Sequence, residues 1–194
     1  MDTFTLDFRL VEKEDAQGIL DIYAWYIQHT AFSFEYTVPS LEAYSDRILK
    51  YAKEAPWIVI EKNNKIFGFA YASPHRGRAA YQWNREVSIY LDNALHGSGV
   101  AKQLYSILLR LLKLQGYTNA LAGVVSPNPK SEAFHQKMGF ELVGTYHNIG
   151  YKHERWWNVN WFELFLQTPD YEPSKLLTMK ELIEHPEYND QFLV

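Results

Sequence analysis

The sequence predicts a mixed α/β fold, with a sheet of about six or seven strands flanked by about four helices. Its hydrophobic content of 47% and charged content of 22% over 194 residues suit one well-packed domain. Strand-like and helix-like periods alternate along the chain, and a glycine-rich turn at residues 96–101 joins a strand to a long amphipathic helix. A further strand after that helix implies a parallel pair within an otherwise antiparallel sheet.

The first elements are a strand over residues 5–11 and a helix over residues 13–29, whose apolar residues recur at helical spacing. Ser40 suits the N-cap of a second helix, which Ala55-Pro56 ends. Residues 57–61 and 66–73 are rich in Val, Ile, Phe and Tyr and flank a polar turn. This pattern predicts an antiparallel hairpin.

The next strand covers residues 81–91 and leads through the glycine-rich turn into a helix that Gly116 stops. A strand over residues 119–125 follows. Asn128 suits the N-cap of another helix, with Pro129 at its first position and Gly139 after its end. Two final strands are predicted over residues 140–145 and 156–165.

A composition shift near residue 168 divides the chain into a domain of residues 1–167 and an acidic, helix-compatible extension of residues 168–194. The extension holds two lysines and six acidic residues, which accounts for the whole net charge of −4. The rest of the chain is therefore neutral and lacks the broad basic field that nucleic acids require. Nucleic acid is not expected as a partner.

Cysteine is absent, which removes disulfides, thiolate nucleophiles and zinc–thiolate sites and makes a reducing cytoplasm the simplest setting. No apolar stretch reaches membrane-spanning length, so no membrane association is expected. The seven histidines show no metal-ligand spacing, and no metal is expected. Covalent catalysis through an acyl-enzyme also has no supporting motif.

The turn His96-Gly97-Ser98-Gly99-Val100-Ala101 has the features of a phosphate-binding loop. Glycines allow close approach of an anion to backbone amides, and the first turn of the following helix adds unpaired donors. The alternative is that the glycines only turn the chain. The loop lacks the third glycine of a dinucleotide fingerprint and is followed by no Gly-Lys-Ser/Thr, which disfavours nicotinamide and nucleoside-triphosphate enzymes.

Over residues 5–166 the chain resembles the GNAT acetyltransferases, and most of all their phosphinothricin N-acetyltransferase branch. The turn meets the superfamily pattern Gln/Arg-x-x-Gly-x-Gly/Ala, with His96 at the first position. The branch is further indicated by Tyr81-Gln82-Trp83, by Glu86-Val87-Ser88-Ile89-Tyr90 and by Gly150-Tyr151-Lys152-His153. The resemblance implies a strongly twisted mixed sheet of the GNAT type.

The resemblance also implies acetyl-CoA as co-substrate. Its pyrophosphate is expected on the backbone amides of Gly97, Ser98, Gly99, Val100, Ala101 and Lys102. Its pantetheine arm is expected along Ile89, Tyr90 and Leu91, with a contact to Asn128. Without the resemblance, the strand segment would be interpreted as ordinary core and Asn128 as a helix cap.

Glu86 matches the proposed base of the branch, which takes the proton of the acceptor ammonium directly or through water. The alternatives are a solvated strand glutamate and an ion pair with the neighbouring Arg85. His135 lies where the branch has a histidine that can protonate the departing thiolate, and a structural, half-buried histidine is the alternative there.

The acceptor is expected near Arg76, Gly77 and Arg78, because a guanidinium grips an anionic group with two parallel hydrogen bonds. Glu86, Val87 and Ser88 are expected to complete that site. The resemblance implies direct transfer of the acetyl group to the α-amino group of a small amino acid or analogue. It also implies that the protein is a homodimer. Alternatives are a peptide N-terminus or a polyamine as acceptor, and a non-catalytic acyl-CoA sensor. The segment Phe34-Glu35-Tyr36-Thr37 departs from the branch pattern in the loop expected to line the acceptor site.

Overall fold

The computed structural model describes residues 6–192 and contains one twisted sheet covered by helices. The strands are β1 (Asp7–Leu10), β2 (Trp57–Lys62), β3 (Lys65–Pro74), β4 (Asn84–Leu91), β5 (Asn119–Ser126), β6 (Glu141–Lys152) and β7 (Arg155–Phe165). The helices are α1 (Ala16–His29), α2 (Leu41–Ala52), α3 (Val100–Gln115), α4 (Pro129–Lys137) and α5 (Met179–Ile183). No helix in the described range is long and apolar enough to cross a membrane.

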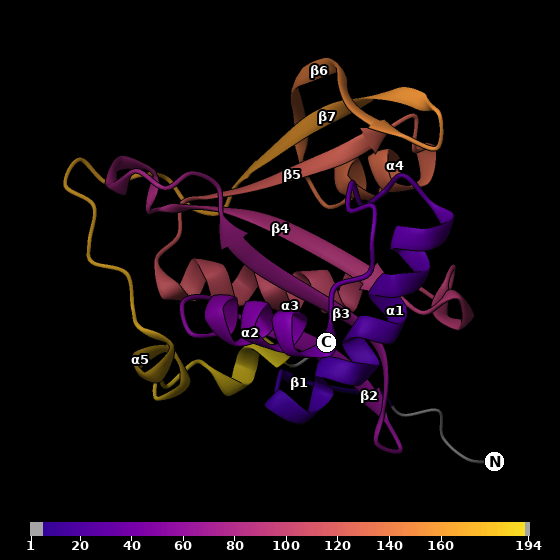
Figure 1. Cartoon of the computed structure of the whole chain (residues 1–194). Helices are drawn as coiled ribbons and strands as arrows, with labels where there is room; N and C mark the ends of the chain where they lie inside the picture. Colours follow the sequence, from indigo (N-terminus) through magenta and orange to yellow (C-terminus); the bar gives the residue numbers. More distant parts are fainter. Residues whose placement is uncertain (1–5, 193–194) are drawn as a thin grey trace.

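The seven strands follow the order β1-β2-β3-β4-β5-β7-β6, which confirms the predicted mixed sheet. Only β4 and β5 are parallel, and their ladder holds three residue pairs, the last being Glu86 with Leu121. From Val87 onward β4 pairs with β3 alone. Figure 1 shows the two strands close together at one end and diverging toward the other. The sheet therefore opens in its middle, where an extended ligand can lie.

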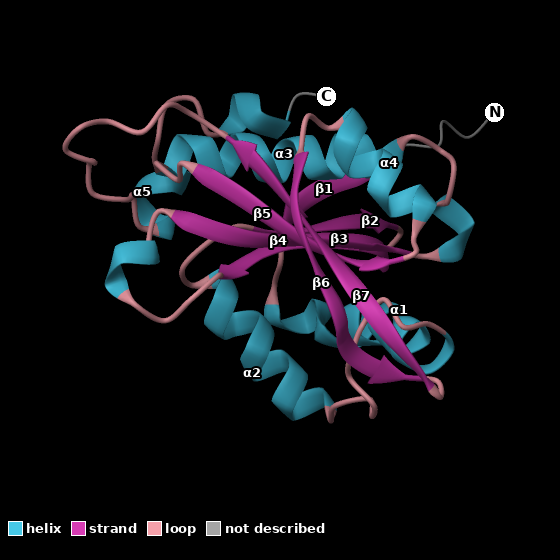
Figure 2. Ribbon diagram, turned by 90° about the horizontal axis from the view of Figure 1, so that it is seen from above, coloured by secondary structure: helices cyan, strands magenta, loops and turns pink. Residues whose placement is uncertain are grey.

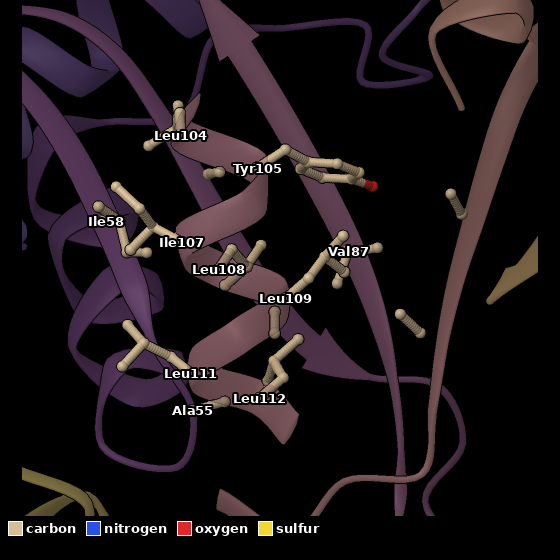
Figure 3. Packing of buried hydrophobic residues seen from close by; sticks show 14 of the residues in the cluster. Ala55, Ile58, Val87, Leu104, Tyr105, Ile107, Leu108, Leu109, Leu111 and Leu112 are labelled. Carbon is tan, nitrogen blue, oxygen red and sulfur yellow. The ribbon is translucent and has the colours of Figure 1, made fainter. Parts of the chain in front are cut away.

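Helices cover both faces of the sheet, with α1 and α2 on one side and α3 and α4 on the other (Figure 2). The core beneath α3 is the larger of the two, and its helix contributes Leu104, Ile107, Leu108, Leu111 and Leu112, each fully buried. Figure 3 shows these side chains beside Ile58 of β2 and Val87 of β4. This packing fixes β4, and with it the residues predicted for the site.

Several element boundaries differ from the sequence prediction. The chain forms a short 3-10 turn over Lys13–Asp15 before α1 begins, because the Asp15 carboxylate turns back to the Arg9 guanidinium at 2.7 Å. Residues 79–81 form another 3-10 turn, so β4 begins only at Asn84. Strand β6 continues to Lys152, well beyond the predicted end, with pairing irregularities that follow the twist of the sheet. Thr5, placed in the first predicted strand, lies outside the described residues.

The extension after residue 168 packs against the domain along α3. Leu182 of α5 is fully buried in the core, and Leu176 lies against Gly116 at the end of α3. The side-chain amide of Gln115 donates to the backbone oxygen of Leu177 at 2.9 Å, and the Leu177 amide returns a bond to Gln115 at the same length. Leu182 therefore completes the core of its own chain and offers no surface to a partner.

Candidate active site

A pocket of about 550 Å³ lies where β4 and β5 diverge. Its walls are Val87 to Leu91 of β4 and Ala122 to Val125 of β5, and its ends are the glycine-rich loop and the start of α4. Most of the predicted cofactor residues therefore meet in one cavity. The strand edge beyond Glu86 is free of β5, so its backbone groups can pair with an extended ligand.

The glycine-rich loop has the conformation that an anion cradle requires. Gly97 and Gly99 adopt φ of +80° and +85°, and a Cβ at either residue would meet no atom within 4 Å. Their amides donate to no other group within the described chain. The pocket borders Gly97, Gly99 and Ala101. Glycine is favoured here by its backbone conformation, and the space beside both Cα atoms is left open.

The other three predicted loop residues are engaged within the protein. The amide of Ser98 donates to Leu95 and that of Lys102 to Gly99, at 3.3 and 3.0 Å. Val100 is buried in the core beneath α3, and its amide points to the Ser98 hydroxyl at 3.4 Å. These residues shape the loop, while Gly97, Gly99 and Ala101 face the pocket.

His96 is fixed by a tyrosine of α1. The Tyr26 hydroxyl donates to the backbone oxygen of Leu91 at 2.8 Å, and the same hydroxyl lies 3.1 Å from Nε2 of His96. Because Tyr26 has only one proton to give, Nε2 of His96 must be the donor in the second bond. The network ties the end of β4 to the loop, and burial raises the pKa of Tyr26.

Asn128 serves as the predicted helix cap, since its side-chain oxygen accepts from the amide of Ser131 at 3.3 Å. It also lines the pocket, so both interpretations of this residue are compatible with the structure. Ile89, Tyr90 and Leu91 line the opposite wall. The Tyr90 ring packs against Tyr23, Tyr26 and Phe69, and burial raises its pKa well above the ordinary value.

His135 lines the pocket but has both ring nitrogens engaged. Nδ1 lies 2.8 Å from the backbone oxygen of Ser131, and because a carbonyl only accepts, Nδ1 carries the proton. Nε2 then accepts from the Tyr105 hydroxyl at 3.1 Å. Burial lowers the pKa of His135 despite the bond to Ser131. A neutral ring held this way has no free N–H, which supports the structural alternative for this residue.

Glu86 is not among the residues that line the pocket, and it is the last residue of β4 that pairs with β5. Its Oε1 accepts from Nδ1 of His75 at 2.8 Å, and Nε of Arg76 contacts Nε2 of the same histidine at 3.3 Å. The alternative for Glu86, an ion pair with Arg85, is not formed, because Arg85 binds Glu54 instead. Sequence reasoning missed His75. The sequence feature that could have indicated His75 is its position directly before Arg76-Gly77-Arg78.

The remaining predicted acceptor residues differ in their surroundings. Val87 and Ser88 both line the pocket, and Val87 is in addition buried in the core beneath α3. Arg76 lies over the Tyr81 ring, with 5.8 Å from its guanidinium carbon to the ring centroid. Arg76, Gly77 and Arg78 are all exposed. Glu86, His75 and Arg76 are thus brought together, while Arg78 stands apart.

Trp161 of β7 connects this group with the pocket. A Cβ at Gly123 would lie 3.4 Å from its ring, and the ring centroid is 5.5 Å from that of His75 in an edge-on arrangement. Gly123 itself lines the pocket. His75, which binds Glu86, and the β4–β5 pocket therefore both lie next to the indole ring of Trp161.

The loop between α1 and α2 is held by contacts of its unusual segment. The Phe34 ring lies against Gly150 of β6, and the Tyr36 hydroxyl donates to the backbone oxygen of Tyr151. Glu35 forms an ion pair with Arg47 and accepts from the Tyr23 hydroxyl. Phe32, from the same loop, borders the pocket. Glu35 is therefore occupied by protein groups, and the loop supplies mainly aromatic surface.

Comparison with known proteins agrees with this architecture. The family model for the acetyltransferase (GNAT) domain matches residues 8–161. The chain belongs to the GNAT acetyltransferase family. Within residues 6–192, no group of three or more His, Asp or Glu side chains is arranged to hold a metal ion.

Relatives of this GNAT chain acetylate small amino-acid analogues according to their names. Phosphinothricin N-acetyltransferase from Streptomyces coelicolor is 30% identical, over 78% of this chain and 91% of that protein. The L-methionine sulfoximine/L-methionine sulfone acetyltransferase of Salmonella typhimurium is 28% identical, over 83% of this chain and 95% of that protein. A crystal structure of a phosphinothricin acetyltransferase from Sinorhizobium meliloti in complex with acetyl-CoA superposes with a TM-score of 0.81 and 29% identity, covering 88% of this chain and 96% of that one.

Proposed function

We propose that this protein transfers the acetyl group of acetyl-CoA to the α-amino group of a small amino acid or analogue, of the phosphinothricin, methionine sulfone or methionine sulfoximine type. The observation that carries the proposal is that the pocket for the cofactor and the group around Glu86 meet on β4, at the place where β4 separates from β5. The pocket between β4 and β5 begins at Val87, and Glu86 is the residue directly before it on β4. The names of the relatives support the acceptor class.

The residues of the pocket fit coenzyme A. The free amides of Gly97 and Gly99, with open space at both Cα atoms, suit a pyrophosphate. The unpaired edge of β4 beyond Glu86 suits the amide-bearing arm, and backbone N–H groups there can also polarise a carbonyl. When bound, the cofactor supplies an acetyl thioester. The protein's part is to hold it extended and to exclude water.

On the acceptor side, Glu86 is the general base. Its Oε1 is bonded to His75, while Oε2 accepts no hydrogen bond from the described chain. That free oxygen can take a proton from the acceptor's ammonium, directly or through one water, and so release the lone pair that attacks. Arg76 contacts the other ring nitrogen of His75 through Nε, and its guanidinium can hold the anionic group of an amino acid.

We assign His135 a structural role, because Nδ1–H is committed to Ser131 and Nε2 accepts from Tyr105. Replacing His135 by Phe should then lower the melting temperature and leave turnover of the folded fraction nearly unchanged. A loss of turnover at unchanged melting temperature would restore the acid role to His135.

The test is an acceptor screen that detects free thiol released from acetyl-CoA. The panel holds amino acids, their sulfone, sulfoximine and phosphinate analogues, polyamines and peptides. Glu86→Gln should lower turnover at least about tenfold, the low end of general-base contributions, and should leave acetyl-CoA affinity unchanged. Glu42→Gln, a change at an exposed position of α2, serves as the matched control. No thiol release with any amine would overturn the proposal and favour an acyl-CoA sensor.

A second acceptor class has one observation in its favour. Arg76 and Arg78 are both exposed, as an open peptide groove would require, and Nε of Arg76 also contacts His75. Thiol release with peptides but not with free amino acids would identify an N-terminal peptide acetyltransferase. A polyamine acceptor would need an acidic pocket, whereas the single carboxylate of Glu86 is here grouped with His75 and Arg76.

We further propose a homodimer that uses the exposed apolar residues of the edge strand β6. Leu142, Val143, Tyr146 and Ile149 of this edge strand are about half exposed, from 47% to 56%. Exposed apolar residues gathered on an edge strand are typical of association surfaces. Light scattering during gel filtration should give twice the chain mass, and Val143→Lys should give the monomer. A monomeric wild type would contradict this.

A further inference from the structure

The hydrogen bonds of His75 determine which of its nitrogens carries the proton. Arginine only donates, so the contact of 3.3 Å from Nε of Arg76 makes Nε2 of His75 an acceptor. The proton of the neutral ring then resides on Nδ1, which donates to Oε1 of Glu86 at 2.8 Å. The three side chains form a directed chain from Arg76 through His75 to Glu86.

The packing around His75 leaves its ring little freedom. The edges of Trp161 and Tyr81 meet it at centroid distances of 5.5 and 6.2 Å, with interplanar angles of 74° and 77°. Its side chain is only 17% exposed, compared with 34% for Glu86. The more buried histidine can therefore act as a fixed support for the more exposed carboxylate.

We propose that His75 is the positioning residue of this site, and that its Nδ1–H fixes Oε1 of Glu86 so that Oε2 alone faces the acceptor ammonium. This inference rests on the proposed function, because it assumes that Glu86 is the base. When the proton moves, the N–H bond of the ammonium breaks and an O–H bond forms at Oε2. The hydrogen bond at Oε1 keeps the carboxylate from rotating away during this transfer.

The hydrogen bonds from Arg76 through His75 to Glu86 also link binding of the acceptor to the position of the base. Arg76 is the residue closest in the chain to His75 that can bind an anionic group, and it also fixes the proton on Nδ1 through Nε. Its terminal nitrogens remain free to hold a carboxylate or phosphinate while Nε stays on His75. A small acceptor with such a group is thereby placed beside a base whose orientation the same arginine supports.

Two variants of His75 separate hydrogen bonding from packing. His75→Phe keeps an aromatic ring against Trp161 and Tyr81 but removes Nδ1, whereas His75→Asn keeps a side-chain N–H near the place of Nδ1 and removes the ring. We expect kcat to fall about 10- to 100-fold in His75→Phe, the scale of a misplaced catalytic group. The KM for acetyl-CoA should not change, because His75 does not border the β4–β5 pocket.

In His75→Asn we expect kcat to recover to within about fivefold of the wild type, since the uncharged amide again donates one hydrogen bond to the Glu86 carboxylate. Equal losses in both variants would show that the ring's packing matters instead and would overturn the proposal. Unchanged kcat in His75→Phe would overturn it as well. Circular dichroism and melting temperature establish that each variant is folded.

A measurement without turnover distinguishes failure of this inference from failure of the proposed function. Nitrogen-15 NMR of the wild type should show the neutral His75 ring protonated at Nδ1, and Glu86→Gln should disturb that signal. A ring protonated at Nε2, or no response to Glu86→Gln, would overturn the inference even if acetylation is found. If NMR shows the expected tautomer but no amine is acetylated, the hydrogen bond between His75 and Glu86 stands and the proposed function is refuted instead.

Discussion

Replacing Gly99 by alanine should weaken coenzyme A binding more than it weakens the fold. Gly99 has φ of +85° and stands immediately before α3, with its amide free and its Cα facing open space. An added Cβ therefore meets no protein atom. The loss of stability comes from the strained backbone conformation, and the loss of affinity comes from weaker contacts with the bound coenzyme A.

The size of each effect of Gly99→Ala depends on whether the backbone at residue 99 keeps its left-handed conformation. If alanine keeps the left-handed conformation, the cost is about 1–2 kcal/mol, equivalent to a fall in melting temperature of about 2–8 °C at this chain length. If the backbone relaxes instead, the adjoining peptide groups turn away from the pocket. One hydrogen bond to a charged phosphate is then lost, about 1.5–3 kcal/mol, which corresponds to about 10- to 150-fold weaker binding.

Titration calorimetry with coenzyme A and thermal melting without ligand measure the two effects separately. Gly144→Ala is the matched control, because its Cβ would also meet no atom within 4 Å while its φ lies outside the left-handed region. Gly144 is on β6, away from the pocket. If Gly99→Ala binds coenzyme A like Gly144→Ala, the loop is not the phosphate site.

Leu182→Ala should lower stability by about 2–5 kcal/mol, the cost of emptying a fully buried leucine site, whereas Ile183→Ala at a half-exposed position should cost under about 1 kcal/mol. Equal melting temperatures would mean that α5 does not dock in solution. Burial lowers the pKa of His135 below the 6.5 of an unfolded chain, so the unfolded state binds the extra proton first as the solution is acidified. The stability that neutral His135 contributes is full above that value and is lost as the pH falls through the folded pKa. Urea unfolding at several pH values should show a smaller acid loss in His135→Asn, and an identical loss would contradict the buried neutral ring.

Local sequence signals predicted the elements well where one short segment decides the structure. Ser40 and Asn128 cap their helices through side-chain oxygens, as expected from residue type. Gly116 ends α3 in the left-handed conformation, and the hairpin of β2 and β3 forms around its polar turn. Each of these features depends on hydrogen bonds or backbone preferences within a few residues, which the sequence displays directly.

Features that depend on distant partners were not visible in the sequence. The continuation of β6 follows from pairing with β7, and the place of α5 follows from a gap in the core beneath α3 that Leu182 fills. The orientation of His75 requires Trp161, more than eighty residues away in the chain. Periodicity carries no information about such contacts, because the contacting side chains belong to different elements.

The sequence by itself determined the order of elements, the glycine-rich loop before α3 and, through its motifs, the resemblance to acetyltransferases. Only the tertiary structure decided that β4 and β5 separate after three pairs, which of the loop amides stay free, and that His135 is engaged on both nitrogens. It also joined His75 to Glu86. The physical reason is that local conformation is encoded in neighbouring residues, whereas the direction and occupancy of hydrogen bonds depend on which strands meet in space.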